Sequence, residues 1–392
     1  MHDAVILSGV RTPIGAFMGS LSGITAPRLG AIAIKESLVR AGVSPDQVDE
    51  VIMGCVLTGA MGQAPARQAA IYGGLPDSVP CLSINKVCGS GMKSVMLAAQ
   101  SVRLGDSSVV VAGGMESMSN APYALEKART GYRMGNGTLI DTMIHDGLWD
   151  PYSNVPMGNC GDLCAKECNF TREQLDAFSQ ESVRRARAAQ DGGLLAQEIV
   201  PVEVPQRKGD PLVVDKDEEP GRAMPDKIPS LRPAFDKEGV TTAGNASSID
   251  DGAAALVISS AERAKELGVK PLARIVGYAT HAQQPQWFTT APATAIEKLL
   301  ANAGLTVSDI DLFEVNEAFA VVAMVVAQKV GISHDKLNVN GGAVAIGHPI
   351  GMTGARLVLT AMHELRRRGG RYAVATPCIG GGEATAVLIE AL

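Results

Sequence analysis

The sequence predicts an α/β protein built from two similar halves, with a different segment inserted between them. Residues 33–54 and 295–316 align with each other without a gap. Apolar runs at 107–112 and 371–376 each lead into a glycine-rich segment, as expected of central strands that are covered on both faces. Hydrophobic residues make up 46% of the chain and charged residues 19%, which is enough apolar material for large cores.

The two aligned segments have the same order of elements. Each reads as an amphipathic helix, a glycine that ends it, a short turn with an acidic residue and a buried strand. A chance likeness is the alternative, but the match covers all three element types. The positions identical in both copies are Ala33/Ala295, Ile34/Ile296, Leu38/Leu300, Ala41/Ala303, Gly42/Gly304 and Asp49/Asp311.

The inserted segment differs in composition from both halves. It is rich in Met, Pro, Asn, Asp and Gly, and an irregular stretch of this length is usually a lid or a binding loop. A helix is expected to start at Thr171 within it. We expect an N-terminal half of residues 1–118 plus 250–270, a loop domain of residues 119–249 and a C-terminal half of residues 271–392.

Charge and hydropathy argue against several classes of protein. The net charge is −6 and no basic stripe is visible, so nucleic acid is not an expected partner. The start of the chain does not resemble a signal peptide, and no apolar run reaches the ~20 residues needed to span a membrane. Seven cysteines without a regular framework do not suggest a disulfide scaffold. We expect a cytoplasmic protein. The run Arg366–Arg368 is expected to form a solvated helix end rather than a binding patch.

Cys88 stands at a predicted strand-to-helix turn. The segment Asn85–Gly91 (NKVCGSG) precedes an apolar helix, so the thiol would lie at the positive end of that helix. The pKa of a thiol in such a place can fall well below its usual value of about 8.5. Cys88 is therefore a candidate nucleophile, and an inert buried cysteine is the alternative.

Two further glycine-rich segments carry reactive side chains. His348 lies in NVNGGAVAIGHPIGMTG, where an imidazole could take a proton from a thiol. Cys378 follows a predicted strand and precedes Gly380–Gly382, whose backbone N–H groups could stabilise an oxyanion. The alternatives are a structural loop histidine and a buried cysteine beside a glycine turn.

Two polar residues and a cysteine stripe complete the candidates. Asn316 could hold a water or a carbonyl and Glu317 could orient a neighbour, although polar residues after a strand are often caps. Cys160, Cys164 and Cys168 would form one stripe on a helix. Because their spacing matches no structural zinc pattern, we expect a packed helix face rather than a metal site.

Together these segments resemble the thiolase family, and the resemblance runs the full length of the chain. It is carried by VCGSG around Cys88, NEAFA from Asn316, NGGAVAIGHPIGMTGAR around His348 and CIGGG from Cys378. Further matches are ILSGVRTPIGAF, GGMESMSNAPY and LRPAFDKEG followed by TAGNASSIDDGAA. These motifs are long and specific.

The resemblance implies a fold and a mechanism. The fold would be a duplicated five-layered α-β-α-β-α core with an inserted loop domain. Cys88 would carry the acyl group, His348 would take the thiol proton, and Cys378 would exchange a proton with the methyl carbon of a second acetyl-CoA. His348 and a water on Asn316 would stabilise one oxyanion, and the N–H groups of Cys88 and Gly380 would stabilise the other.

Coenzyme A is the substrate and product that the resemblance implies, with no tightly bound cofactor and no metal. Arg222 is matched, in a loosely aligned stretch, to a residue near the nucleotide phosphates. The residues matched to pantetheine-contacting positions are Leu148, Met157, Phe235, Ala243, Ser247, Ala318 and Phe319.

Residues 140–148 (IDTMIHDGL) resemble the short-chain type, which condenses two acetyl-CoA molecules to acetoacetyl-CoA. That type commonly has a histidine before Met157, whereas this chain has Pro156, as in thiolases for longer chains. A degradative 3-ketoacyl-CoA thiolase of fatty-acid β-oxidation is therefore the alternative. Glu383, after the glycine run, is a second departure, and the resemblance assigns it no role.

Other classes fit the residues less well. A non-catalytic acyl-CoA-binding relative should have lost the reactive residues, which are all present here. A decarboxylating condensing enzyme normally has histidine or asparagine where Cys378 stands. Residues 119–145 resemble the tetramer-forming loop of short-chain thiolases, so a homotetramer, as a dimer of dimers, is expected.

Overall fold

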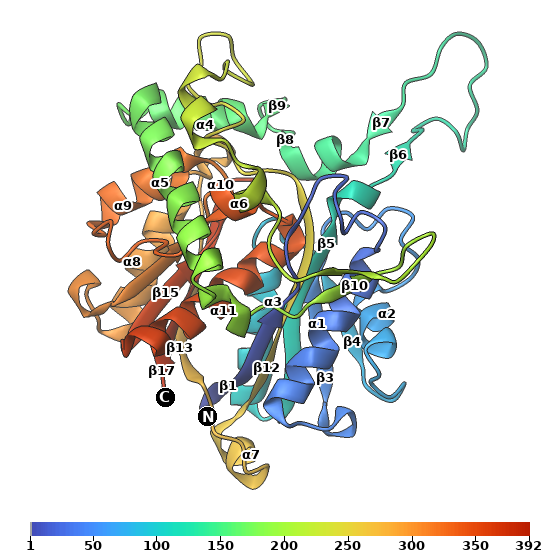
Figure 1. Ribbon diagram of the computed structural model, residues 1–392, viewed down its shortest axis with the longest axis vertical. Coiled ribbons are helices and arrows are strands. Elements are labelled where there is room, and N and C mark those ends of the chain that lie inside the picture. The colour runs from blue at the N-terminus through green and yellow to red at the C-terminus, as the bar shows by residue number, and fades with distance from the viewer. Residues whose placement is uncertain (1) are drawn as a thin grey trace.

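A computed structural model describes residues 2–392 and shows one long sheet made of two halves (Figure 1). The halves meet where β1 pairs with β13 at Val5/Arg274 and Ile6/Ala273. The first half has the strand order β4-β3-β5-β12-β1, and the second has β13-β17-β15-β14. The strands are β1 (Ala4–Arg11), β3 (Glu50–Gly54), β4 (Cys81–Ile84), β5 (Val109–Ser117), β12 (Asp250–Ser260), β13 (Ala273–Ala282), β14 (Leu312–Val315), β15 (Tyr372–Thr376) and β17 (Glu383–Ala391), with short β2 (Gly15–Ala16) on β12 and β16 (Cys378–Ile379) on β17.

Helices cover both outer faces of the sheet and fill the space between its halves. The outer helices of the first half are α1 (Ala26–Ala41) and α2 (Pro65–Tyr72), and those of the second are α8 (Ala291–Ala303) and α9 (Ala320–Val330). Between the halves lie α3 (Ser90–Leu104) and α11 (Ile350–Arg368). Side chains of β1 alternate accordingly, with Ile6 in the central core and Val5 in the core under α1. The expected five-layered α/β fold is confirmed.

The internal repeat is confirmed as a pair of matching structural units. In the first, α1 ends at Gly42 and a 3₁₀ turn, η1 (Pro45–Gln47), leads into β3. In the second, α8 ends at Gly304 and η7 (Val307–Asp309) leads into β14. Both glycines are left-handed, with φ of 65° and 67°, a conformation that costs glycine little.

The shared aspartate of the repeat accepts equivalent hydrogen bonds in both halves. Asp49 Oδ2 accepts hydrogen bonds from the backbone of Ser108 (2.7 Å) and Val109 (2.8 Å). Asp311 Oδ2 accepts them from the backbone of Arg371 (2.7 Å) and Tyr372 (3.1 Å). Each carboxylate therefore ties the start of its own strand to the start of the strand beside it.

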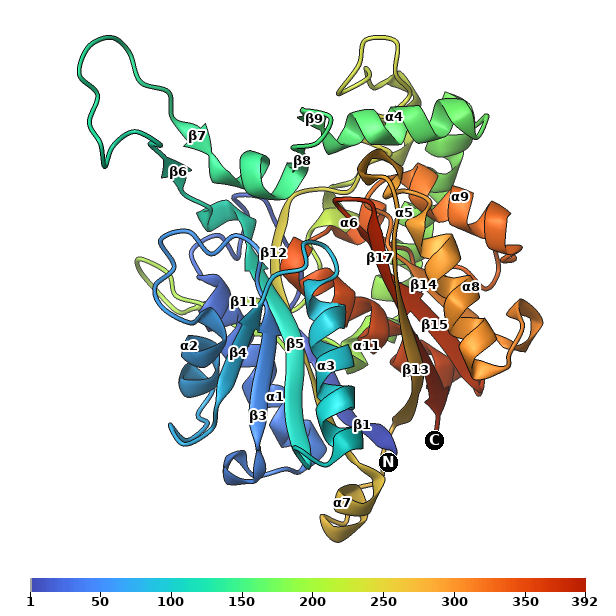
Figure 2. The ribbon, with the colours of Figure 1, turned by 180° about the vertical axis from the view of Figure 1, so that it is seen from behind.

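The inserted segment leaves the sheet after β5 and returns in β12. The hairpin of β6 and β7 projects far from the body of the molecule (Figure 2). A helix starts after Thr171, as expected, with a capping box formed by Gln174. The segment's elements are η2 (Met118–Asn120), β6 (Tyr123–Ala124), β7 (Ile140–Asp141), η3 (Ile144–Leu148), β8 (Trp149–Asp150), β9 (Val155–Pro156), α4 (Met157–Glu167), α5 (Arg172–Asp191), η4 (Leu194–Gln197), β10 (Val202–Val204), β11 (Leu212–Val214), α6 (Glu219–Arg222) and η5 (Pro225–Ser230).

The remaining elements are α7 (Ala261–Glu266), η6 (Pro285–Trp287) and α10 (Ala343–Ile346). Within residues 2–392, no helix is long and apolar enough to cross a membrane.

Cys160 and Cys164 pack into the core that α8 and α9 cover, and Cys168 lies against its edge. The three arginines end α11 before left-handed Gly369, as expected.

The equivalence of Asp49 and Asp311 makes a prediction about stability. Asp49→Ala and Asp311→Ala should each lower the free energy of unfolding by about 1–3 kcal/mol, because each leaves two strand-end N–H groups without their charged acceptor. Thermal unfolding should show similar falls in midpoint for both. Asp106→Ala, at an exposed aspartate, is the matched control; a change at only one of the two repeat positions would contradict the equivalence.

Candidate active site

Cys88 is held in a tight turn between β4 and α3. The preceding residue, Val87, has a left-handed φ of 47°, a strained conformation that persists only where the surroundings enforce it. Asn85 Oδ1 accepts a hydrogen bond from Val87 N (2.9 Å). Ser90 Oγ accepts one from Lys86 N (2.8 Å) and donates one to Val87 O (2.7 Å). The turn therefore fixes Cys88 two residues before the first residue of α3.

His348 occupies the corresponding place on α11, two residues before Ile350. A Gly-Met pair follows three residues after each reactive side chain, at Gly91 and at Gly351. The two helices cross at these glycines: a Cβ on Gly91 would lie 3.0 Å from Gly351 O and 2.7 Å from the backbone N of Ala355. This close approach brings the two helix starts together. The relation was not predicted, although the repeated Gly-Met spacing was a visible signal.

A short hydrogen-bond chain fixes the tautomer of His348. Its Nδ1 lies 2.6 Å from Thr353 Oγ1, and that hydroxyl donates to Pro349 O at 3.0 Å. Because the hydroxyl proton is directed to the carbonyl, Nδ1 must carry the proton in the other bond. Nε2 is then unprotonated, and it lies 3.3 Å from Asn316 Nδ2. The lone pair of Nε2, which accepts a long hydrogen bond from Asn316 Nδ2 at rest, is the one able to take a proton.

Asn316 joins His348 to Cys378. It follows β14, and its backbone N donates to Thr376 O at 3.0 Å. Its amide reaches His348 Nε2 on one side and the sulfur of Cys378 on the other. Asn316 Oδ1 is buried and has no hydrogen-bond partner among the described residues, so it is able to hold a water.

Desolvation keeps the side chains of Cys88 and His348 uncharged. It raises the pKa of Cys88 to about 11, although the nearby backbone N–H groups of Gly380 and of Cys88 itself act in the opposite direction and lower the pKa. The expectation of a lowered pKa for Cys88 is therefore wrong, because desolvation outweighs the helix end. Burial, and to a lesser degree the charge of Arg356, lowers the pKa of His348 to about 3.

Cys378 is a third uncharged group. It is fully buried in β16. Burial, followed by the charge that Cys88 can carry, raises the pKa of Cys378 well above its usual value. The arrangement therefore offers two neutral thiols and one neutral imidazole, which can exchange protons as bonds form and break.

Buried carboxylates hold the loop around His348. Asp250 Oδ2 accepts from His348 N at 2.8 Å, and burial raises the pKa of Asp250. Glu116 accepts from Gly351 N at 2.9 Å, and burial raises the pKa of Glu116 to about 7. Glu317, a candidate orienter, accepts from Ser182 Oγ (2.7 Å) and Asn338 Nδ2 (2.7 Å), so it supports loops rather than facing the cavity.

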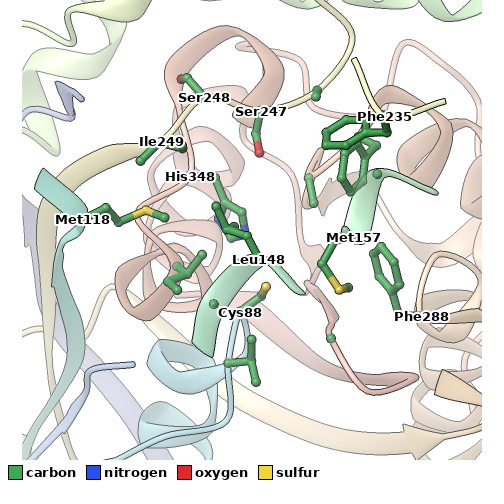
Figure 3. Close-up of a pocket in the computed structure, with 18 residues that line it drawn as sticks. Cys88, Met118, Leu148, Met157, Phe235, Ser247, Ser248, Ile249, Phe288 and His348 are labelled. Carbon is green, nitrogen blue, oxygen red and sulfur yellow. The ribbon is translucent and has the colours of Figure 1, made fainter. Parts of the chain in front are cut away.

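An apolar cavity of about 210 Å³ opens beside Cys88 and His348 (Figure 3). Three of the five predicted catalytic residues line it: Cys88, His348 and Gly380. Cys378 and Asn316 are buried next to these residues rather than on the cavity wall. The structure thus brings all five together.

Most of the residues matched to pantetheine positions also line the cavity. They are Leu148, Met157, Phe235, Ser247, Ala318 and Phe319. Ala243 is exposed near the cavity-lining segment 246–249, and Arg222 is exposed at the end of α6; neither lines the cavity. The lining residues not predicted from sequence are Val87, Met118, Gly147, Gly158, Ala246, Ser248, Ile249, Phe288 and Ile350.

Phe288 shows why part of the cavity wall could not be predicted from the sequence. It lies before α8, in a stretch without a catalytic motif, yet its ring is 6.3 Å from that of Phe319. Phe235 meets Phe319 edge-on at 6.1 Å. The three rings come from segments far apart in the chain, so only the fold assembles this aromatic wall.

Comparisons with known proteins agree with this geometry. The chain matches the family models "Thiolase, N-terminal domain" over residues 4–262 and "Thiolase, C-terminal domain" over residues 269–391. It is 53% identical to acetyl-CoA acetyltransferase 2 of Arabidopsis thaliana, covering 100% of this chain and 98% of that protein. It is 52% identical to the acetyl-CoA acetyltransferase of Cupriavidus necator, with 100% of both covered.

The fold has an equally close match among solved structures. The crystal structure of the Bacillus anthracis acetyl-CoA acetyltransferase superposes with a TM-score of 0.98 at 42% identity. The match covers 100% of this chain and 99% of that one. Fold, site geometry and both family models therefore agree that the chain belongs to the thiolase family.

Proposed function

We propose that the protein is an acetyl-CoA acetyltransferase that reversibly condenses two acetyl-CoA molecules to acetoacetyl-CoA and coenzyme A. The observation that carries the proposal is the meeting of Cys88, His348 and Gly380 on one apolar cavity. Two thiols with separate surroundings suit a reaction with two proton transfers. The names of the relatives, about half identical over the full chain, support the same activity.

In the first half-reaction, Cys88 takes the acetyl group from acetyl-CoA. Its sulfur attacks the thioester carbon while His348 Nε2 accepts the thiol proton. The N–H groups of Cys88 and Gly380 stabilise the oxyanion of the tetrahedral adduct; losing such a donor typically costs on the order of 3 kcal/mol. The bond to the coenzyme A sulfur then breaks, and His348 returns the proton to that sulfur as coenzyme A leaves.

In the second half-reaction, a second acetyl-CoA becomes the nucleophile. His348 takes the thiol proton of Cys378, and the resulting thiolate removes a proton from the methyl carbon. Protonated His348 and a water on Asn316 stabilise the enolate oxygen. The carbon attacks the acetyl group on Cys88, the carbon–sulfur bond breaks, and the Cys88 thiolate recovers a proton from His348. Cys378 keeps the proton that it took from the methyl carbon, so all three groups are neutral again. In thiolysis Cys378 gives the proton instead, a role that its raised pKa favours.

Coenzyme A enters along the wall that Met157, Phe235 and Phe319 form. Apolar walls of this kind bind an extended thiol arm by contact area, and a few polar groups orient it. We propose Arg222 for the nucleotide phosphates and Ala243 for the pantetheine arm, at the outer end of this path. Coenzyme A is substrate and product here, with no tightly bound cofactor in the reaction.

The acyl pocket favours a short chain. Cys88 packs against an apolar cluster of Val56, Leu57, Met118, Met143 and Ile350, which borders the sulfur that would carry the acyl group. Pro156, the reason to consider longer substrates, precedes the first residue of α4 and is not among the residues that line the cavity. The degradative alternative is therefore not favoured.

We propose a homotetramer in the cytoplasm. The projecting β6–β7 hairpin carries exposed apolar side chains, Tyr123, Leu125, Met134 and Leu139, which suit burial between subunits. All seven cysteines are free thiols, as suits a reducing compartment.

Light scattering should give four times the 40.7 kDa of one chain, and a stable dimer would contradict the tetramer.

Chain-length kinetics test the substrate. Thiolysis should be at least about tenfold more efficient, in kcat/KM, with acetoacetyl-CoA than with 3-ketohexadecanoyl-CoA. A long tail would have to fit past the apolar cluster beside Cys88, and a clash of about 1.4 kcal/mol already costs tenfold. Spectrophotometric thiolysis assays on both substrates measure this. A preference for the longer substrate would contradict the proposal.

Thr353 provides a test of the His348 tautomer. Thr353→Val should lower kcat by roughly 10–100-fold with little change in KM, because Nδ1–H loses its acceptor and the tautomer with a free Nε2 is no longer favoured; general base catalysis contributes about 10²–10⁴-fold. Thr353→Ser, which keeps the hydroxyl, should stay within about threefold of wild type. Steady-state kinetics of both variants decide, and an unchanged kcat in Thr353→Val would refute the tautomer assignment.

A further inference from the structure

Lys86 and Glu383 form an ion pair that joins two separate turns of the site. The pair involves Lys86 Nζ and Glu383 Oε2. Lys86 stands two residues before Cys88, and Glu383 stands three residues after Gly380. The family resemblance assigns no role to Glu383. Neither residue is among those that line the cavity. The geometry therefore favours an indirect role over direct contact with the substrate.

Each partner is tied rigidly to its own turn. The backbone of Lys86 donates to Ser90 Oγ (2.8 Å) and accepts from Gly89 N (3.0 Å). Glu383 begins β17, and its backbone pairs with Ile379 across the turn that contains Gly380. Because the backbones are fixed, a force between the two side chains acts on the distance between the two turns.

The same two turns are packed against each other on a second side. A Cβ on Gly89 would lie 2.3 Å from Ile379 Cδ1, so the two turns are in close contact at this point. Val87 Cγ1 lies next to Gly380, 3.7 Å from where a Cβ of that glycine would be. The contact prevents the turns from moving closer, and the ion pair opposes their moving apart.

These turns supply the two N–H donors that meet at the sulfur of Cys88. The backbone N–H groups of Cys88 and Gly380 both lie near enough to that sulfur to lower its pKa. We propose that Lys86 and Glu383 are positioning residues that set the separation of these two donors, and hence the quality of the oxyanion hole. This inference rests on the proposed acetyl-transfer function, and it adds two residues that set the geometry of the oxyanion hole.

The pair is partly exposed, with 23% of the Lys86 side chain and 35% of the Glu383 side chain accessible. Exposed pairs contribute little to global stability. The expected effect is therefore on catalysis rather than on folding. A fully lost oxyanion donor typically costs 10²–10³-fold in kcat, so a displaced donor should cost less.

The test uses Glu383→Ala, Lys86→Met and the charge-swapped double variant Lys86→Glu/Glu383→Lys. Each single variant should lose roughly tenfold in kcat for acetoacetyl-CoA thiolysis, with KM within about threefold and an unchanged thermal midpoint. The double variant should recover most of the loss, because the attraction is restored with its sign reversed. Glu266→Gln, which breaks the partly exposed Arg263–Glu266 pair on α7 at the opposite end of the molecule (Figure 1), is the matched control.

A substrate-independent readout separates this inference from the proposed function. The rate of Cys88 alkylation by iodoacetamide, followed by peptide mass spectrometry, should fall several-fold in Glu383→Ala at a fixed pH, because the thiolate loses support from Gly380 N–H. Wild-type alkylation and kcat in both single variants would overturn the inference, as would a change confined to KM. Wild-type protein without thiolase activity would instead overturn the proposed function while leaving the alkylation result interpretable.

Discussion

The close crossing of α3 and α11 is the constraint on which the rest of the site depends. Gly91 and Gly351 lie where the helices touch, and a side chain at Gly91 would meet the backbone of the other helix. Because Cys88 and His348 stand at the same offset before their helices, this one contact determines that a thiol and an imidazole meet. The duplicated architecture thus produces a site from two equivalent positions that carry different residues.

The depth of the crossing also sets the electrostatics. Cys378 and His348 are buried and Cys88 is half-buried on the cavity wall, so the ionised forms of all three are disfavoured at rest. Charge therefore develops mainly during the reaction, where the N–H groups of Cys88 and Gly380 are already in place to meet it. Preorganised donors in a largely buried site are worth more than donors in water, because they do not have to reorient.

Much of the fold could be predicted from the residues alone. The gapless repeat predicted two helix–glycine–strand units, and the structure shows both, including the matching roles of Asp49 and Asp311. The glycine-rich motifs identified Cys88, His348 and Cys378, because reactive side chains beside glycines at strand ends are a local pattern.

Properties that depend on tertiary packing were beyond the sequence. The pKa of Cys88 was expected to fall, whereas burial by distant segments raises it. The aromatic wall around Phe288 and the partner of Glu383 come from chain segments that no local pattern links. Pro156 looked informative about chain length, but its neighbours Met157 and Gly158 are the residues that reach the cavity.

The central claim is that Cys88 carries the acetyl group and that His348 takes its proton. Rapid mixing of the protein with acetyl-CoA, followed by peptide mass spectrometry, tests this most directly. Wild type should show one acetyl group on the Cys88 peptide within a turnover, while His348→Asn should acylate that peptide at least about 10²-fold more slowly. Acetylation on another residue, or equal rates in the two proteins, would contradict the account.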